Sequence, residues 1–126
     1  MKTSDLSRAC LQAYVDKDRS AAEALIAADF RFTSPIDNAL DRKTYFARCW
    51  PNSESMSAVR VVQAVDDGEY AFVVYEADTP TKRFRNCEVH LARAGKLVSV
   101  EVYFGWDLPH PATPGGFVDK EGTGHA

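Results

Sequence analysis

The chain has 126 residues, of which 45% are hydrophobic and 26% are charged, which is typical of one globular domain and not of a disordered chain. Its net charge of −3 argues against nucleic acid as a partner, because phosphate binding requires a concentrated positive field. No apolar run approaches the roughly 20 residues of a membrane-crossing helix, and the first ten residues read as the start of a helix and not as a signal peptide. We therefore expect no membrane partner and a cytoplasmic location.

The cysteine and histidine pattern gives no sign of a metal or a disulfide framework. Cys10, Cys49 and Cys87 are odd in number and widely spaced, without the CxxC pair of a zinc site. His110 and His125 lie near the C-terminus without a partner at ligand spacing. We therefore expect reduced thiols, no metal and no cofactor.

The first third of the sequence has helical periodicity. A stripe of Leu6, Cys10 and Tyr14 predicts a helix that begins near Ser4. Residues 20–23 form a capping box for a second, shorter helix. After a short alternating strand at residues 30–33, Asp41 is placed to cap a third helix that ends before Pro51.

From residue 57 onward the period changes from 3.6 to 2. Strands are predicted at residues 57–65, 70–77, 82–93 and 97–104, separated by an Asp67-Gly68 turn, a turn at residues 78–81 and an Ala94-Gly95 turn. Helices followed by an antiparallel meander predict an α+β fold, with a domain at residues 1–105 and a tail at residues 106–126 rich in proline and glycine.

Four segments resemble, in order, the nuclear transport factor 2-like superfamily, and in detail its ketosteroid isomerases. They are CLQAYV around Tyr14, the bend at Pro35, CWPNS around Trp50, and GKLVSVEVYFG at residues 95–105. Residues 83–110 are also similar to SnoaL-like domains. The resemblance covers roughly residues 4–105 and implies a cone, in which three helices pack on a strongly curved, mostly antiparallel sheet around an inner pocket.

The isomerase resemblance also implies positions for catalytic groups. That family uses an Asp base and an oxyanion hole made of a Tyr and a protonated Asp. The tyrosine corresponds to Tyr14, but the base position is occupied by Ser34, which is no base near neutral pH without help. The second donor corresponds to Cys87 in a regular strand, or to Glu88 if the strand contains a bulge. Steroid isomerisation by that mechanism is therefore not expected.

Alternation assigns the faces of the strands. The apolar positions of the last strand predict its inner face, and pairing across the two preceding turns extends that face to the neighbouring strands. The predicted pocket has an apolar floor and a polar mouth. Its lining is predicted to be Trp50, Phe72, Val74, Cys87, Val89, Val100, Val102 and Phe104.

Three residues are candidates for catalysis, each with a structural alternative. Tyr14 could donate a hydrogen bond to a ligand carbonyl or be a core tyrosine. Glu76, placed on the inner face, could move a proton or form a rim ion pair with Arg83. Asp37 could reach the pocket mouth or serve only as a turn residue.

Glu88 and His90 are two apart on one strand, and alternation places both on the outer face. A catalytic role for this pair would require a bulge near Asn86. On a regular strand they join Val73, Tyr75 and Tyr103 on a surface too apolar to be left in water. This surface predicts a homodimer through the outer face of the sheet.

The sequence supports two functional hypotheses. In the first, the chain is a cofactor-independent enzyme acting on a small apolar carbonyl compound, and the family resemblance implies an isomerase, cyclase, dehydratase or hydrolase. In the second, the same fold is a non-catalytic ligand-binding or protein-interaction module. The titratable groups that face the pocket discriminate between them.

Overall fold

The computed structural model describes residues 1–119, so residues 120–126 of the predicted tail, with His125, lie outside the described residues. Its elements follow one another in this order: α1 (Thr3–Asp16), α2 (Arg19–Leu25), β1 (Ile26–Ser34), β2 (Asp37–Asp41), α3 (Arg42–Arg48), the 3-10 helix η1 (Trp50–Ser55), β3 (Ala58–Asp67), β4 (Tyr70–Asp78), β5 (Arg83–Arg93) and β6 (Lys96–Leu108).

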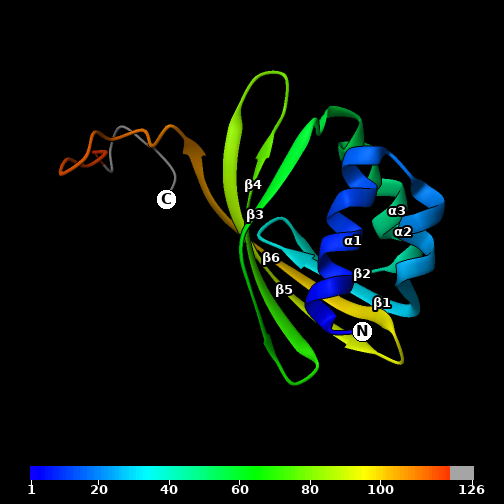
Figure 1. The fold of residues 1–126 in the computed structure, drawn as a ribbon. Helices are drawn as coiled ribbons and strands as arrows, with labels where there is room; N and C mark the ends of the chain where they lie inside the picture. Colours follow the sequence, from blue (N-terminus) through cyan, green and yellow to red (C-terminus); the bar gives the residue numbers. More distant parts are fainter. Residues whose placement is uncertain (120–126) are drawn as a thin grey trace.

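The strands form one curved sheet in the order β2-β1-β6-β5-β4-β3, and the helices lie against its concave side (Figure 1). Each neighbouring pair is antiparallel except β1 and β6, which are parallel. The predicted α+β cone with a mostly antiparallel sheet is therefore confirmed. The sequence did not predict β2, and it predicted only residues 30–33 of β1.

α2 and α3 begin at side-chain caps, whereas α1 begins at Thr3 with Lys2, and not Ser4, at the N-cap position. The Asp41 carboxylate accepts a hydrogen bond from the Thr44 amide (2.8 Å), as predicted for α3. For α2 the cap is Asp18 and not Ser20. Leu6 and Cys10 of α1 pack into the core with Phe30 of β1, which is fully buried.

A β-bulge at Val98 sets which side chains face the interior. The Ala94-Gly95 turn pairs Ala92 with Leu97, but the next pair is Leu91 with Ser99, so Val98 is an extra residue on β6. Beyond it, His90 lies opposite Val100. Because side chains alternate along a strand, this one extra residue reverses the face of β5 relative to the apolar face of β6.

The reversed face corrects the predicted lining. Glu88 and His90 point into the molecule, and on β4 the buried positions are Ala71, Val73, Tyr75 and Ala77. The predictions for Phe72, Val74, Glu76, Cys87 and Val89 were wrong, because these residues occupy the opposite faces of β4 and β5. β4 is apolar on both faces, so its own pattern did not reveal the error.

A second irregularity lies where β5 pairs with the end of β6. Asn86 is opposite Phe104, while Phe84 is opposite Asp107, so Gly105 and Trp106 share the position facing Arg85. A Cβ atom on Gly105 would lie 2.1 Å from the Arg85 carbonyl oxygen. The two strands therefore approach each other as closely as they do only because residue 105 is glycine.

We expect Gly105→Ala to lower the free energy of unfolding by about 1–3 kcal/mol, the usual cost of forcing an atom into a packed site. Chemical denaturation measures the change. Gly68→Ala serves as the comparison for backbone strain alone, because no atom lies within 4 Å of a Cβ there and its positive φ itself costs about 1–2 kcal/mol. A Gly105→Ala variant as stable as the wild type would contradict the close approach.

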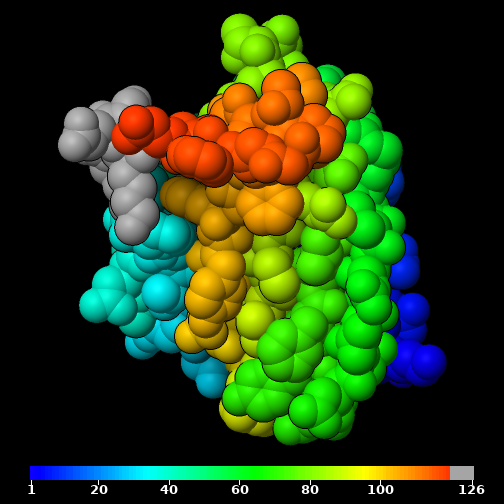
Figure 2. Space-filling model, turned by 90° about the vertical axis from the view of Figure 1, so that its left-hand side faces the viewer, coloured from blue at the N-terminus to red at the C-terminus, as the bar shows by residue number. Residues whose placement is uncertain are grey.

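The convex face of the sheet carries exposed aromatic side chains, but of the three predicted residues only Tyr103 lies there. Val73 and Tyr75 are buried inside, whereas Phe72 and Tyr103 are 43% and 54% exposed on the outer face. Figure 2 views this face and shows the segment after β6 lying across one end of it. The homodimer through this face stays a prediction, as does the boundary at residue 105, although β6 itself continues to Leu108.

No helix among residues 1–119 is both long enough and apolar enough to cross a membrane.

Candidate active site in the cone

A cavity of about 560 Å³ lies between the helices and the concave face of the sheet. Its closed end is formed by fully buried residues of β1 and β5, including Phe30 and His90. Its rim includes Phe104 and Trp106 of β6, which are 56% and 47% exposed. This size and this mainly apolar lining with a few polar groups are typical of a site for a small organic molecule.

A carboxylate and an imidazole meet at the closed end of the cavity. The Glu88 Oε1 atom lies 2.7 Å from His90 Nε2, and the His90 side chain is 1% exposed. On the other side of the ring, Nδ1 lies 2.5 Å from the Ser7 hydroxyl of α1. Both ring nitrogens therefore have a partner, and the ring is fixed in orientation.

The hydrogen-bond directions indicate where the proton of this pair lies. Ser7 carries a single hydroxyl hydrogen, which goes either to the Thr3 carbonyl (3.0 Å) or to His90 Nδ1 (2.5 Å). In the first case Nδ1 carries the proton of its contact with Ser7, and in the second case Nδ1 accepts. In both arrangements one proton lies between His90 Nε2 and Glu88 Oε1.

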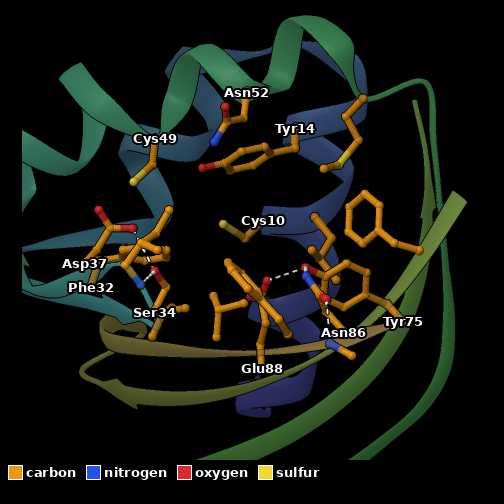
Figure 3. A pocket seen from close by; sticks show the side chains of 18 of the residues that line it. Cys10, Tyr14, Phe32, Ser34, Asp37, Cys49, Asn52, Tyr75, Asn86 and Glu88 are labelled. Atoms are coloured by element: carbon orange, nitrogen blue, oxygen red, sulfur yellow. Dashed lines mark hydrogen bonds between the residues drawn. The ribbon is translucent and has the colours of Figure 1, made fainter. Parts of the chain in front are cut away.

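The second oxygen of Glu88 is also held. Tyr75 donates its hydroxyl hydrogen to Glu88 Oε2 (2.7 Å), and the Asn86 amide donates in turn to the Tyr75 oxygen (3.3 Å) (Figure 3). The Gly105 amide donates to Asn86 Oδ1 (3.2 Å), which ties this chain of bonds to the second bulge. Glu88 is thus positioned from both sides by buried or half-buried groups.

A pair of tyrosine hydroxyls forms a second polar group in the cavity. Tyr14 of α1 and Tyr45 of α3 are hydrogen-bonded through their hydroxyl oxygens. Burial raises the pKa of both side chains, so both stay protonated at neutral pH. Only one of the two hydroxyl hydrogens lies between the oxygens, which leaves the other for a ligand acceptor.

The Asp37 carboxylate is bound by an arginine and by a serine hydroxyl. Its Oδ1 atom lies 2.5 Å from Arg48 Nε, and Ser34 donates to its Oδ2 atom (2.7 Å). The hydrogen bond from Arg48 lowers the pKa of the Asp37 carboxyl, which is therefore ionised at neutral pH. This carboxylate lines the cavity as a hydrogen-bond acceptor and is a weaker base than an unpaired one.

The structure brings together some of the residues singled out from the sequence. Tyr14, Asp37, Val100, Val102 and Phe104 line the cavity. Trp50 lies behind Tyr14, with ring centroids 4.8 Å apart, and is a packing residue. Glu76 is outside the cavity and pairs with Arg60 (3.8 Å), not with Arg83.

Sequence reasoning missed several polar residues of the site. Tyr45, Tyr75 and Asn86 reach the cavity from different elements, and Ser7 contacts His90 from α1. None of the four belongs to a local motif. The presence of Glu88 and His90 among apolar strand residues was the available signal. Alternation placed both residues on the outer face, because nothing in the sequence shows where a strand contains a bulge.

Comparisons with known proteins identify the fold. No family model matches the sequence, and no curated protein matches it. A solved NTF-2 like protein of unknown function from Burkholderia xenovorans LB400 superposes with a TM-score of 0.70 at 16% identity, over 98% of this chain and 92% of that chain. The chain has the nuclear transport factor 2-like fold.

Other solved proteins with this nuclear transport factor 2-like fold have named activities. A ketosteroid isomerase-like protein from Kribbella flavida DSM 17836 has a TM-score of 0.71 at 17% identity, over 94% of this chain and 88% of that chain. An LEH-like epoxide hydrolase of M. tuberculosis has a TM-score of 0.67 at 16% identity, over 82% of each chain. At such identities the likeness shows the fold alone.

Two cysteine thiols, those of Cys10 and Cys49, also line the cavity. Burial raises the pKa of Cys10 to about 12 and that of Cys49 to about 11. Within residues 1–119 no three His, Cys, Asp or Glu side chains are grouped as metal ligands. The absence of a metal or cofactor remains a prediction.

These pKa values predict the order of thiol reactivity. The thiolate is the reactive form, so Cys10 and Cys49 are expected to react slowly with iodoacetamide at pH 8. Cys87 lies on the outer face and is half-buried, and although burial raises its pKa too, it is expected to react first. Mass spectrometry of peptides after a short pulse measures the order, with Cys87→Ser as control. Faster labelling of Cys10 than of Cys87 would contradict this assignment.

Proposed function

We propose that the chain binds a small, largely apolar organic molecule in the cavity and transfers a proton on it without a cofactor. The observation that carries this proposal is the Glu88–His90 pair, held from both sides by Ser7 and Tyr75 at the closed end of an apolar cavity. A positioned carboxylate that exchanges a proton with an imidazole is suited to general acid–base catalysis. The named activities of the isomerase-like and epoxide hydrolase neighbours support the same class of function.

The reaction class that fits best is proton abstraction next to a carbonyl group. A C–H bond of the ligand breaks, its proton goes to Glu88, and the electron pair moves to the carbonyl oxygen as an enolate. The hydroxyl hydrogen left free by the Tyr14–Tyr45 pair would stabilise this oxyanion. Return of the proton to another carbon would complete an isomerisation. Attack of the enolate carbon on an electrophilic carbon of the same molecule would complete a cyclisation, and loss of a β-hydroxyl, which leaves as water with the proton from Glu88, would complete a dehydration. Redox equivalents are not needed.

A ligand screen followed by isotope exchange tests the proposal. Small neutral carbonyl and aromatic compounds are screened for an increase in melting temperature, since a ligand that binds only the folded state stabilises it. Each hit is then incubated with the protein in D₂O, and mass spectrometry measures deuterium incorporation next to the carbonyl. We expect incorporation by the wild type and a slower rate for Tyr14→Phe.

The outcome separates the two functional hypotheses. Hits that bind without any deuterium incorporation would contradict the enzyme and favour the non-catalytic binding module. Incorporation that is unaffected by Tyr14→Phe would contradict the role given to the tyrosine pair, while leaving Glu88 as the base.

A further inference from the structure

The cavity has two polar ends (Figure 3). Tyr75, Asn86 and Glu88 lie on one side, and Ser34 and Asp37 lie on the other. The wall beside Asp37 is aromatic: the rings of Phe30 and Phe32 each lie 5.0 Å, centroid to centroid, from the ring of Tyr45. Such a wall favours a flat or aromatic ligand, because offset and edge-to-face ring contacts add to the burial of apolar area.

Cationic side chains in this region are already paired. Arg48 is bound to Asp37 at 2.5 Å. Lys82, the one lysine or arginine among the described lining residues, lies at the rim beside Asp107 (3.9 Å), and both side chains are more than half exposed. His90 is engaged on both ring nitrogens. An anionic ligand would lose its hydration here without gaining an unpaired cation, which is unfavourable.

Asp37 offers a complementary interaction. A carboxylate has about four lone-pair sites, and Arg48 and Ser34 occupy one on each oxygen. Its side chain is 7% exposed and lines the cavity, so the remaining sites face a volume that a ligand would fill. A buried acceptor of this kind requires a donor, and a ligand hydroxyl or amide N–H supplies one.

We propose that the cavity selects a flat, non-anionic molecule that donates a hydrogen bond from one end to Asp37. This inference rests on the proposed function, in which the cavity holds the ligand. It assigns Asp37 to ligand specificity and leaves proton transfer to the Glu88–His90 pair on the other side. The separation explains why a carboxylate held by an arginine and a carboxylate paired with a histidine share one cavity.

Isothermal titration calorimetry with matched biphenyl probes tests the inference. Biphenyl-4-ol carries a donor, 4-methoxybiphenyl lacks it, and biphenyl-4-carboxylate replaces it with a negative charge. We expect the phenol to bind the wild type about tenfold more tightly than the methyl ether, as for a hydrogen bond to a charged group. The carboxylate is expected to bind at least about tenfold more weakly than the phenol, since it finds no free cation.

Asp37→Asn changes the expected preference. The variant releases Arg48 from its partner, so biphenyl-4-carboxylate should gain affinity while the advantage of the phenol over the methyl ether shrinks. Asp29→Asn is the matched control, because it removes the same charge from an exposed residue of β1 that does not line the cavity. This control should keep the order of the wild type, and thermal unfolding checks that both variants are folded.

Equal or tighter binding of the carboxylate by the wild type would overturn the inference, as would an unchanged order in Asp37→Asn. Failure of all the probes to bind would also overturn it, together with the ligand site of the proposed function. Binding in the expected order without deuterium exchange on any screened ligand would support the inference and remove only the proton-transfer step. The two proposals therefore fail separately.

Discussion

Glu88→Gln is expected to reduce deuterium exchange on a bound carbonyl ligand by about 10²–10⁴-fold, the usual contribution of a general acid or base. Glutamine keeps the size of the side chain and can still accept the hydrogen bond that Tyr75 donates to Glu88 Oε2. It has no carboxylate to take the proton of the ligand. Ligand affinity is therefore expected to change far less than the exchange rate.

The chain offers a matched control for this experiment. Glu76→Gln makes the same chemical change on the neighbouring strand β4, where the side chain lies outside the cavity and pairs with Arg60. We expect it to exchange at the rate of the wild type. Full activity of Glu88→Gln, or loss of activity in Glu76→Gln, would contradict the assignment of the base and would favour the face predicted from the sequence.

His90→Leu is expected to destabilise the protein by about 3–5 kcal/mol, because it leaves the Glu88 carboxylate without its partner in a nearly closed site. Urea unfolding measures the change. Leucine has a volume close to that of histidine, so the loss of the hydrogen bonds to Ser7 and Glu88 accounts for most of it.

A double-mutant cycle separates the pairing from the packing. In the Glu88→Gln/His90→Leu variant no charge is left unpaired, so the combined loss should be smaller than the two single losses added together, by about 1–3 kcal/mol. Additive losses would show that the two side chains contribute independently, and the pair would then not be a coupled unit.

The sequence was sufficient for the fold because the fold depends on patterns spread over many residues. The helical stripe through Leu6 and Cys10, the Asp41 cap and the turns at Gly68 and Gly95 each determine a local structure, and these structures are compatible with one arrangement. β2 was missed because its five residues have no alternation of their own. Its strand conformation comes from pairing with β1.

The site was harder to predict from the sequence because it depends on which face of each strand points into the cavity. The inward positions of Val100 and Val102 follow from apolar alternation alone, so they were predicted. The face of β5 that points inward depends on how many residues of β6 lie between the Ala94-Gly95 turn and Val100. A ladder without a bulge places Glu88 and His90 outside the cavity and Glu76 inside it, which is why the predicted lining was wrong at these positions.

The extra residue at Val98 also has a consequence for how this lining could change over generations. Deletion of that one codon would leave a regular ladder in which Leu91 still pairs with Ser99 and His90 with Val100. The acid–base pair and the two valines of the wall would therefore stay on one face of the sheet. The bulge thus absorbs a one-residue difference in length beside the hairpin, so the same lining can persist in chains with and without the extra residue.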